Sequence, residues 1–323
     1  MKYKYFLFAA VAAFLFACEK EIEFKGDEVK TKLVLNGILM PDSVVKIQLT
    51  ESRFFLDSNR LFNQIDDADV RLWKDGVLKE TLQNTGEGYY VGTYVPREGD
   101  NLRITASHTG FDPVECETQI VSPTPIISAD TTNTDIEKYC YYQYDEDDWT
   151  IIIDSVKFVI FKGDITITFK DPADIAGYYI ILLDLRTRYE SGNVYVQPLR
   201  YTSDDLVFKT DNELPFDDDD DFNSQYSYQF SDELFDGKEY KIKIKADSYS
   251  GYYWPDEDSK ITNRELQVTL QSLSPSYYMY IKTREANSDS YFFTEPVQIY
   301  TNITGGIGIF GNYSNSTFRI PLD

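Results

Sequence analysis

The chain has 323 residues, with 54 Asp and Glu against 31 Lys and Arg, and its formal net charge is −23 at pH 7. Such a surface repels nucleic acid, because polyanions are bound through clustered Lys and Arg. Aromatic residues make up 15% of the chain and include 26 Tyr, which is far too many for a disordered protein. We therefore expect a folded, acidic protein that binds no nucleic acid, and the length suggests two domains of ordinary size.

The N-terminus has the three-part layout of a secretory signal peptide. Lys2 and Lys4 give it a short positive region, and residues 6–16 form an apolar run that is too short to span a membrane as a helix. A small alanine then precedes Cys18. We predict a signal peptide over residues 1–17.

Residues 15–18 (Leu-Phe-Ala-Cys) resemble a bacterial lipobox, in which the cysteine receives a diacylglycerol and becomes the mature N-terminus. An ordinary signal peptide with an incidental cysteine is the alternative. We predict that Cys18 is lipidated, that acyl chains hold the protein on a membrane, and that the charged residues 18–31 are a tether. The start of this tether resembles the signal that places lipoproteins of the Bacteroidota on the outer face of the outer membrane. That resemblance implies a surface-exposed, outer-membrane protein, and the periplasmic face of the membrane is the alternative.

Short alternating segments separated by turn signals follow, which is the pattern of sandwiches and barrels. In residues 32–122 we expect seven or eight strands, with Asp75-Gly76 as a hairpin turn. That number of strands in about 90 residues is typical of an immunoglobulin-like β-sandwich. Residues 123–135 are rich in Thr, Ser, Pro and Asp, so we predict a linker there.

Residues 136–323 are predicted to form a second sandwich, of the fibronectin type III kind, with long loop insertions and one short helix. Tyr240 and the alternating lysines of residues 241–245 resemble the E–F corner of that fold, where a Tyr hydrogen-bonds back across the corner. Phe169 would then be the central core aromatic. Ser274 is a good N-cap and a proline follows it, which predicts the helix. The expected fold class is all-β, with two tandem β-sandwiches.

Two cysteines remain beside Cys18, namely Cys116 and Cys140. The predicted compartment is oxidising, so a disulfide between them is allowed. The alternative is two separate thiols, because Cys116 lies on the face of its strand that should point inward.

No motif for catalysis is recognisable. The single histidine, His108, sits beside a turn and is expected to be exposed, and one His makes neither a zinc site nor a charge-relay triad. There is no nucleophile elbow, phosphate loop or dinucleotide fingerprint, and Gly305 to Gly308 lack the Lys of a phosphate cradle and predict a turn. We expect a protein that is not an enzyme. A hydrolase with an unusual pair of carboxylates is the remote alternative.

Two tyrosine-rich segments are the strongest candidates for a binding surface. Several adjacent aromatics in one loop cannot all face one core, and exposed Tyr and Trp contact partners at low entropic cost. They could stack on a glycan or hold a peptide or protein partner; the alternative is that they cap the ends of the sandwiches. The candidate binding residues are Tyr141, Tyr142, Tyr144, Tyr252, Tyr253 and Trp254.

A run of five aspartates follows Phe216. Calcium prefers such oxygen ligands, although the run lacks the spaced acids and central glycine of an EF-hand, and a solvated acidic loop is the alternative. The weak calcium candidates are Asp217, Asp219 and Asp221. No other cofactor is expected.

Three triplets that begin with Asp resemble the O-glycosylation sites that Bacteroidota use in their envelope. They start at Asp42, Asp130 and Asp154. Thr131 is the candidate acceptor, because it falls in the predicted linker and linkers are exposed.

Residues 293–311 (FTEPVQIYTNITGGIGIFG) resemble the closing signature of the domain-of-unknown-function 4249 family of Bacteroidota lipoproteins. Residues 33–37 (LVLNG), 68–72 (ADVRL) and 88–94 fit the family as well, so the resemblance covers nearly the whole mature chain. The five aspartates are not expected throughout the family. We expect residues 302–311 to form a glycine-rich turn, anchored by its apolar residues, that packs on the helix and joins the two units.

The family has no established catalytic residues to transfer to this chain. Its members resemble accessory proteins of TonB-dependent outer-membrane receptors, which implies a part in nutrient uptake. The resulting hypothesis is a lipoprotein that is not an enzyme and binds a ligand or partner beside such a receptor. A structural or adhesion protein of the surface is the alternative.

Overall fold

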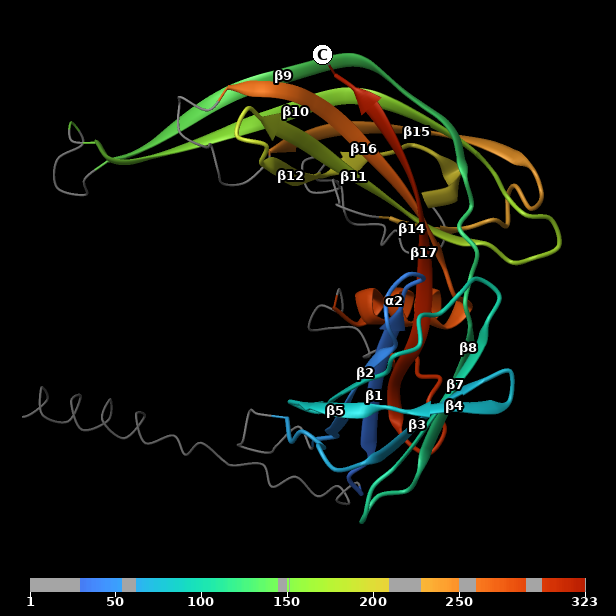
Figure 1. Ribbon diagram of the computed structural model, residues 1–323. Coiled ribbons are helices and arrows are strands. Elements are labelled where there is room, and N and C mark those ends of the chain that lie inside the picture. The colour runs from blue at the N-terminus through green and yellow to red at the C-terminus, as the bar shows by residue number, and fades with distance from the viewer. Residues whose placement is uncertain are drawn as a thin grey trace, which may run out of the picture.

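The computed structural model describes residues 30–53, 62–144, 150, 152–208, 228–249, 260–288 and 298–322. Within these ranges the chain is almost wholly β-structure with one α-helix, which confirms the all-β prediction (Figure 1). No helix in the described part of the chain is both long and apolar enough to cross a membrane.

Residues 33–119 contribute eight strands to the first sandwich, which agrees with the expected number for this range. With the C-terminal strand β17 (Ile307–Pro321), its two sheets have the orders β17-β1-β2-β6-β5 and β4-β3-β7-β8. Alternating apolar side chains of both sheets, such as Leu35, Ile47, Leu72 and Ile104, form one core. The strands are β1 (Leu33–Leu39), β2 (Lys46–Glu51), β3 (Asp69–Lys74), β4 (Val77–Thr81), β5 (Gln83–Gly86), β6 (Tyr89–Val91), β7 (Asn101–Ser107) and β8 (Val114–Gln119).

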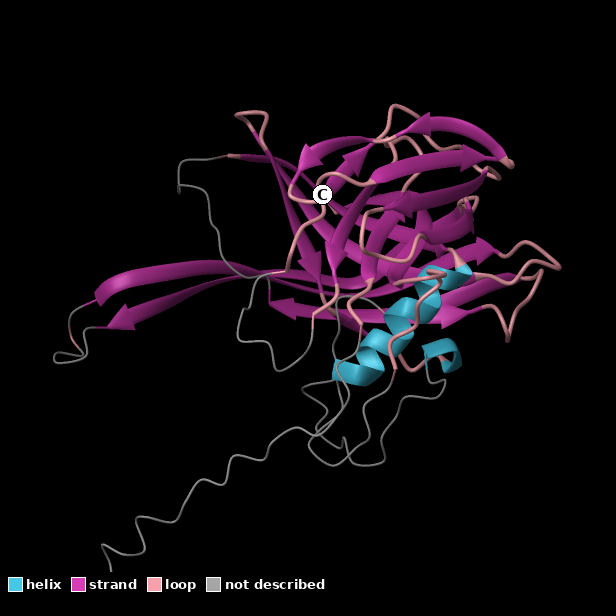
Figure 2. Cartoon of the chain, turned by 90° about the horizontal axis from the view of Figure 1, so that it is seen from below, coloured by secondary structure: helices cyan, strands magenta, loops and turns pink. Residues whose placement is uncertain are grey.

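The second sandwich packs the sheet β13-β15-β10-β9 on the sheet β12-β11-β16-β17 (Figure 2). Phe169 is fully buried at its centre, and its ring lies 5.5–5.6 Å from the rings of Tyr179 and Phe235, which confirms it as a core aromatic. The strands are β9 (Ile126–Tyr144), β10 (Ile152–Lys170), β11 (Tyr178–Tyr189), β12 (Val194–Leu199), β13 (Tyr201–Thr202), β14 (Gln229–Ser231), β15 (Glu239–Tyr249) and β16 (Ile261–Leu273), with a short 3₁₀ helix at Leu206–Phe208.

The last strand, β17 (Ile307–Pro321), belongs to both sandwiches. Its first half, residues 307–312, pairs parallel with β1, and its second half pairs antiparallel with β16. A single nine-stranded sheet therefore runs through the molecule. The expectation that the C-terminal segment joins the two units is confirmed, and the first sandwich is completed by residues far outside the range 32–122.

Glycines allow β17 to lie against β1. Gly308 has a φ of +119°, and a Cβ there would lie 2.1 Å from the carbonyl oxygen of Leu35. The side chain of Asn302 fixes the preceding turn, since it accepts a hydrogen bond from Phe310 N and donates one to Phe310 O. Phe310 and Ile309 anchor the segment as expected, but Ile307 is 37% exposed and does not.

A row of polar side chains on β17 fixes the connection between the sandwiches. Asn312 is fully buried; its amide donates to Thr118 Oγ1 and Gln119 O at 2.8 Å and accepts from Val121 N at 2.9 Å. Four residues further along β17, on the same face, Ser316 Oγ accepts from Ile126 N at 3.0 Å. These bonds satisfy backbone groups that a free linker would leave to water.

The predicted linker over residues 123–135 is wrong, because residues 126–144 form β9. Its polar composition is compatible with a strand since β9 lies at the edge of its sheet, and Ala129 alone of its first residues is fully inside the core. Pro123 and Pro125 precede the strand, where a missing N–H costs nothing in the ladder. β-Branched threonines favour the extended backbone.

The predicted helix is confirmed as α2 (Pro275–Ser288). Ser274 caps it, with its Oγ accepting from Tyr277 N at 3.4 Å, and the same Oγ accepts from Asn312 N of β17 at 3.0 Å. Tyr278 and Ile281 pack on Ile180 and Leu273 of the shared sheet. The helix therefore covers the sheet where the two sandwiches meet, as Figure 1 shows.

The expected tyrosine corner differs from the fibronectin pattern. The Tyr240 hydroxyl donates to the carboxylate of Asp205 at 2.8 Å rather than to the backbone. Burial and this bond to an anion raise the pKa of Tyr240 to about 12. The alternation after it holds, since Ile242 and Ile244 are buried while Lys241, Lys243 and Lys245 are exposed.

Candidate functional site

Several of the predicted site residues lie outside the described part of the chain. These are the lipidation site Cys18, the calcium candidates Asp217, Asp219 and Asp221, and the second aromatic segment with Tyr252, Tyr253 and Trp254. They stay predictions.

The first aromatic segment is not a loop. Tyr141, Tyr142 and Tyr144 belong to β9, and the register pairs Tyr141 with Val156 and Tyr142 with Ser155 of β10. Tyr142 is 45% exposed. The sequence predicted a loop here because the tyrosines follow one another directly, whereas a half-buried strand shows apolar residues at every second position.

These residues form a two-stranded ribbon that extends beyond the second sandwich. The third strand, β15, pairs with β10 only as far as the partners Ile160 and Tyr249, whereas β9 continues to pair with β10 out to Tyr144 and Ile152. Figures 1 and 2 both show this end of the hairpin projecting from the body as an arm. We call residues 137–144 with 152–159 the arm. Ile152, near its tip, is 51% exposed.

The predicted disulfide is not formed. Cys116 is a free thiol, only 4% exposed, and its Sγ lies 4.0 Å from the carbonyl oxygen of Ile104 on the neighbouring strand. Burial raises the pKa of this thiol far above its usual value, so it is an unreactive core residue. The alternative of separate thiols therefore holds for Cys116.

Thr131 is a poor glycosylation acceptor in the folded chain. It lies in β9 rather than in a linker, and its hydroxyl oxygen is buried without a hydrogen-bond partner. The prediction depended on an exposed hydroxyl, and in the strand the hydroxyl oxygen of the partly buried Thr131 is enclosed.

His108 is also more enclosed than expected. Its side chain is 20% exposed, Nε2 lies 2.8 Å from a carboxylate oxygen of Asp67, and Phe111 packs on the ring at a centroid distance of 5.5 Å. Nδ1 is buried without a partner. The ring is therefore held as a structural contact, and no hydroxyl or thiol of the described residues is bonded to it.

Three carboxylates that the sequence did not single out converge beside the core of the second sandwich. The oxygens of Asp171, Asp232 and Asp236 lie within 4.8 Å of one another, and the first two residues are buried. Oxygen ligands of this kind suit a divalent cation. Each carboxylate, however, already has a structural role as an acceptor from Tyr179 OH and Gly237 N, from Gly177 N, or from Asp174 N.

Like charges and burial change the acidity of this cluster. Burial raises the pKa of Asp232, the hydrogen bond from Gly177 N lowers it, and the nearby charges of Asp171 and Asp236 raise it further, for a net increase. No sequence signal could have found the cluster, because its members lie in two turns about 60 residues apart.

Comparison with known proteins gives one family. The model described as a domain of unknown function, DUF4249, matches residues 19–319. No curated protein matches the chain.

Proposed function

The chain belongs to the DUF4249 family of domains of unknown function, and we propose that it is a lipid-anchored outer-membrane protein, not an enzyme, that acts as an accessory partner of a TonB-dependent receptor in nutrient uptake. Its attachment would be the acylated Cys18. The eleven residues between that cysteine and Lys30 span at most roughly 40 Å when extended. They enter at the start of β1, which lies at the end of the first sandwich away from the second (Figure 1).

The arm is the observation that carries this proposal. A two-stranded ribbon is marginally stable by itself in water, so a ribbon that projects beyond its sheet gains from a partner that covers it. Tyr142 and Ile152 are exposed on it, and such side chains supply contact area at a small entropic cost.

The body can hold the arm in a fixed position. The shared sheet and the buried bonds of Asn312 tie the two sandwiches together, so the base of the arm is held by one continuous body and not by a hinged domain. Preorganisation of this kind lowers the cost of association.

Affinity purification from detergent-solubilised outer membrane tests the proposal. The full-length lipoprotein is compared with a variant in which residues 139–158 are replaced by Asn-Gly, which closes a tight turn between the partners Lys138 and Val159. Because β15 pairs only with the part of β10 that remains, this variant keeps the sandwich. We expect a TonB-dependent receptor to be recovered stoichiometrically with the full-length protein and at least tenfold less with the shortened one.

The matched control is Ile175→Ser, which removes a 66% exposed apolar side chain from a turn outside the arm and should leave recovery unchanged. Recovery of the lipoprotein alone would contradict the accessory role and would favour the structural or adhesion alternative. Equal recovery with the shortened variant would keep the receptor but exclude the arm as the contact.

A further inference from the structure

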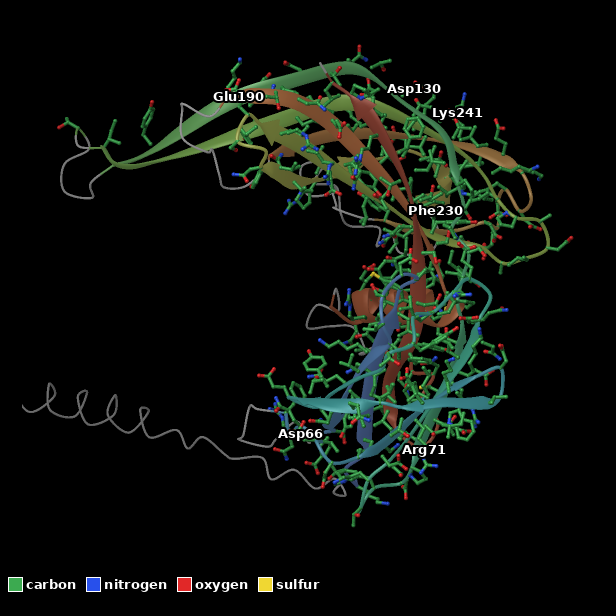
Figure 3. The ribbon with its side chains drawn as sticks, in the orientation of Figure 1. Asp66, Arg71, Asp130, Glu190, Phe230 and Lys241 are labelled. Atoms are coloured by element: carbon green, nitrogen blue, oxygen red, sulfur yellow. The ribbon has the colours of Figure 1, made fainter. Side chains whose placement is uncertain are left out.

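We propose that a hollow on the outer face of the first sandwich binds a neutral carbohydrate. It has a volume of about 470 Å³, within the range of about 300–1,000 Å³ that small-ligand sites occupy. It lies on the solvent side of the sheet β4-β3-β7-β8, on the sandwich that does not carry the arm; Figure 3 labels Arg71, one of its residues. The polar lining consists of Asp69, Arg71, Thr105, Ser107, Glu115 and Thr304.

Strand register brings these side chains into rows. Arg71, Thr105 and Glu115 are successive partners across β3, β7 and β8, and Asp69 and Ser107 are partners in the adjacent row. All five therefore share the face opposite the core residues of the same strands.

The C-terminal signature closes one side of the hollow. Thr304 and Glu115 exchange backbone hydrogen bonds at 2.9 and 3.1 Å. Gly305 next to it approaches Pro113 so closely that a Cβ would lie 2.2 Å from the proline carbonyl oxygen. This rim is consequently fixed by the backbone and does not depend on flexible side chains.

Balanced charge selects a neutral ligand. Arg71 forms a bidentate ion pair with Asp69, with Nε 3.1 Å from Oδ1 and Nη2 2.6 Å from Oδ2. Glu115 pairs with Arg103, whose Nη1 lies 3.5 Å from Glu115 Oε2. An anionic ligand would meet the carboxylates of Asp69 and Glu115, and a cationic ligand would meet the guanidinium group of Arg71. Either would separate existing pairs, whereas a neutral ligand leaves them intact.

The lining offers donors and acceptors side by side, which suits a ligand with several hydroxyl groups. Thr105 Oγ1 accepts from the Trp73 indole at 3.0 Å, so its own O–H proton is directed elsewhere. Ser107 and Thr304 are exposed hydroxyls, and Arg71 has further N–H groups beside the two that contact Asp69.

In the next row, beside the hollow and outside its lining, the Arg103 guanidinium lies 4.7 Å from the centre of the Trp73 ring. The hydroxyls and paired charges of the lining itself favour an oligosaccharide over a purely apolar ligand.

The test is isothermal titration of the purified soluble chain with a panel of neutral oligosaccharides that covers α- and β-linked glucans, mannans, galactans and xylans. Oligogalacturonate and chitosan oligomers are the anionic and cationic comparisons. We expect saturable binding of at least one neutral member at millimolar or lower concentration, and binding at least tenfold weaker for both charged probes.

Two variants test whether the oligosaccharide binds in the hollow. Ser107→Tyr and, independently, Thr304→Tyr fill the hollow from opposite sides at exposed positions and should weaken binding at least tenfold. Val77→Tyr, at a 71% exposed position of the same sheet outside the hollow, is the matched control and should bind as the unmodified chain does. Circular dichroism checks that each variant is folded.

The proposal is overturned if no neutral member binds, if a charged probe binds as well as the best neutral one, or if both filling variants retain full affinity. The assay contains no receptor, so these outcomes are independent of the purification that tests the accessory role.

Discussion

At the residue scale, two buried carboxylates have pKa values displaced in opposite directions by their surroundings. Burial raises the pKa of Asp100, but Lys74 at 2.6 Å, the Tyr94 hydroxyl and Arg97 N outweigh it and leave the pKa below its usual value. Asp232 is buried, forms no ion pair among the described residues and has two other carboxylates close by, so its pKa is above the usual value.

Replacing Asp100 by Asn is expected to destabilise the protein by about 2–3 kcal/mol at pH 7, because the half-buried Lys74 loses its counter-ion and a charged hydrogen-bond acceptor becomes neutral. A carboxylate whose pKa is lowered by folding contributes stability above its unfolded pKa of about 3.9 and loses it as the pH falls. The difference between the variant and the original chain should therefore shrink below about pH 4. Urea denaturation at a series of pH values measures it, and a difference that grows on acidification would contradict the assignment.

Asp232→Asn is expected to have the opposite sign. A carboxyl whose pKa is raised by folding favours the folded state below its unfolded pKa, and that contribution is lost as the pH rises through the folded pKa. The variant, which can still accept the bond from Gly177 N, should melt at a higher temperature than the original chain at pH 7 and at about the same temperature near pH 4.

Thermal melts in EDTA and in millimolar calcium decide between this account and a metal centre. If a cation holds Asp171, Asp232 and Asp236 together, calcium would raise the melting temperature of the original chain only, and Asp232→Asn would melt lower. We expect neither result.

Local signals predicted some of these residues and could not predict others. Ser274 and the proline after it identify a helix start by themselves, and Phe169 was assigned to the core from the resemblance to a fibronectin type III domain. Other features depend on how distant turns and strands pack. These are the contact of Asp171 with Asp232 and Asp236 and the burial of the Thr131 hydroxyl. No short pattern encodes such contacts.

At the scale of elements, β17 requires a glycine at position 308 to lie against β1. Gly308 lies where a Cβ would overlap Leu35 O, and its φ of +119° is one that other residues rarely adopt. Gly110 has a similar φ of +92°, but a Cβ there would have no atom within 4 Å. A comparison of the two glycines therefore separates the cost of the positive φ from the cost of the clash.

Gly308→Ala is accordingly expected to destabilise the protein by about 3 kcal/mol or more, since it adds a backbone clash to the strain. Gly110→Ala should cost about 1–2 kcal/mol from strain alone. Chemical denaturation of both variants measures these costs. Equal costs would show that the close approach of β17 to β1 does not limit stability.

Elements with a clear period or turn signal were predicted from the sequence, and those defined by tertiary pairing were not. The alternation of residues 241–245 and the Asp75-Gly76 hairpin are examples of the first kind. β9 is of the second kind, because its polar edge-strand composition is also that of a linker. The division of β17 between an antiparallel and a parallel partner was expected only as a connection, without its pairing.

At the scale of the whole molecule, one sheet passes through both sandwiches and Asn312 satisfies backbone groups of the connection between them. Neither half can lose its structure without exposing an edge or buried polar groups of the other. Differential scanning calorimetry should therefore show one unfolding transition with equal calorimetric and van't Hoff enthalpies. Two resolved transitions would show that the sandwiches are independent domains.

The proposal that the arm contacts a receptor is tested most directly by site-specific photocrosslinking in intact cells. A photoreactive amino acid is placed at Tyr142 on the arm or at Ile127, which is on the same strand, is similarly exposed, and lies over the sandwich. The account predicts a single large adduct with a TonB-dependent outer-membrane receptor from position 142 and none from position 127. Adducts from both positions, or from neither, would contradict it.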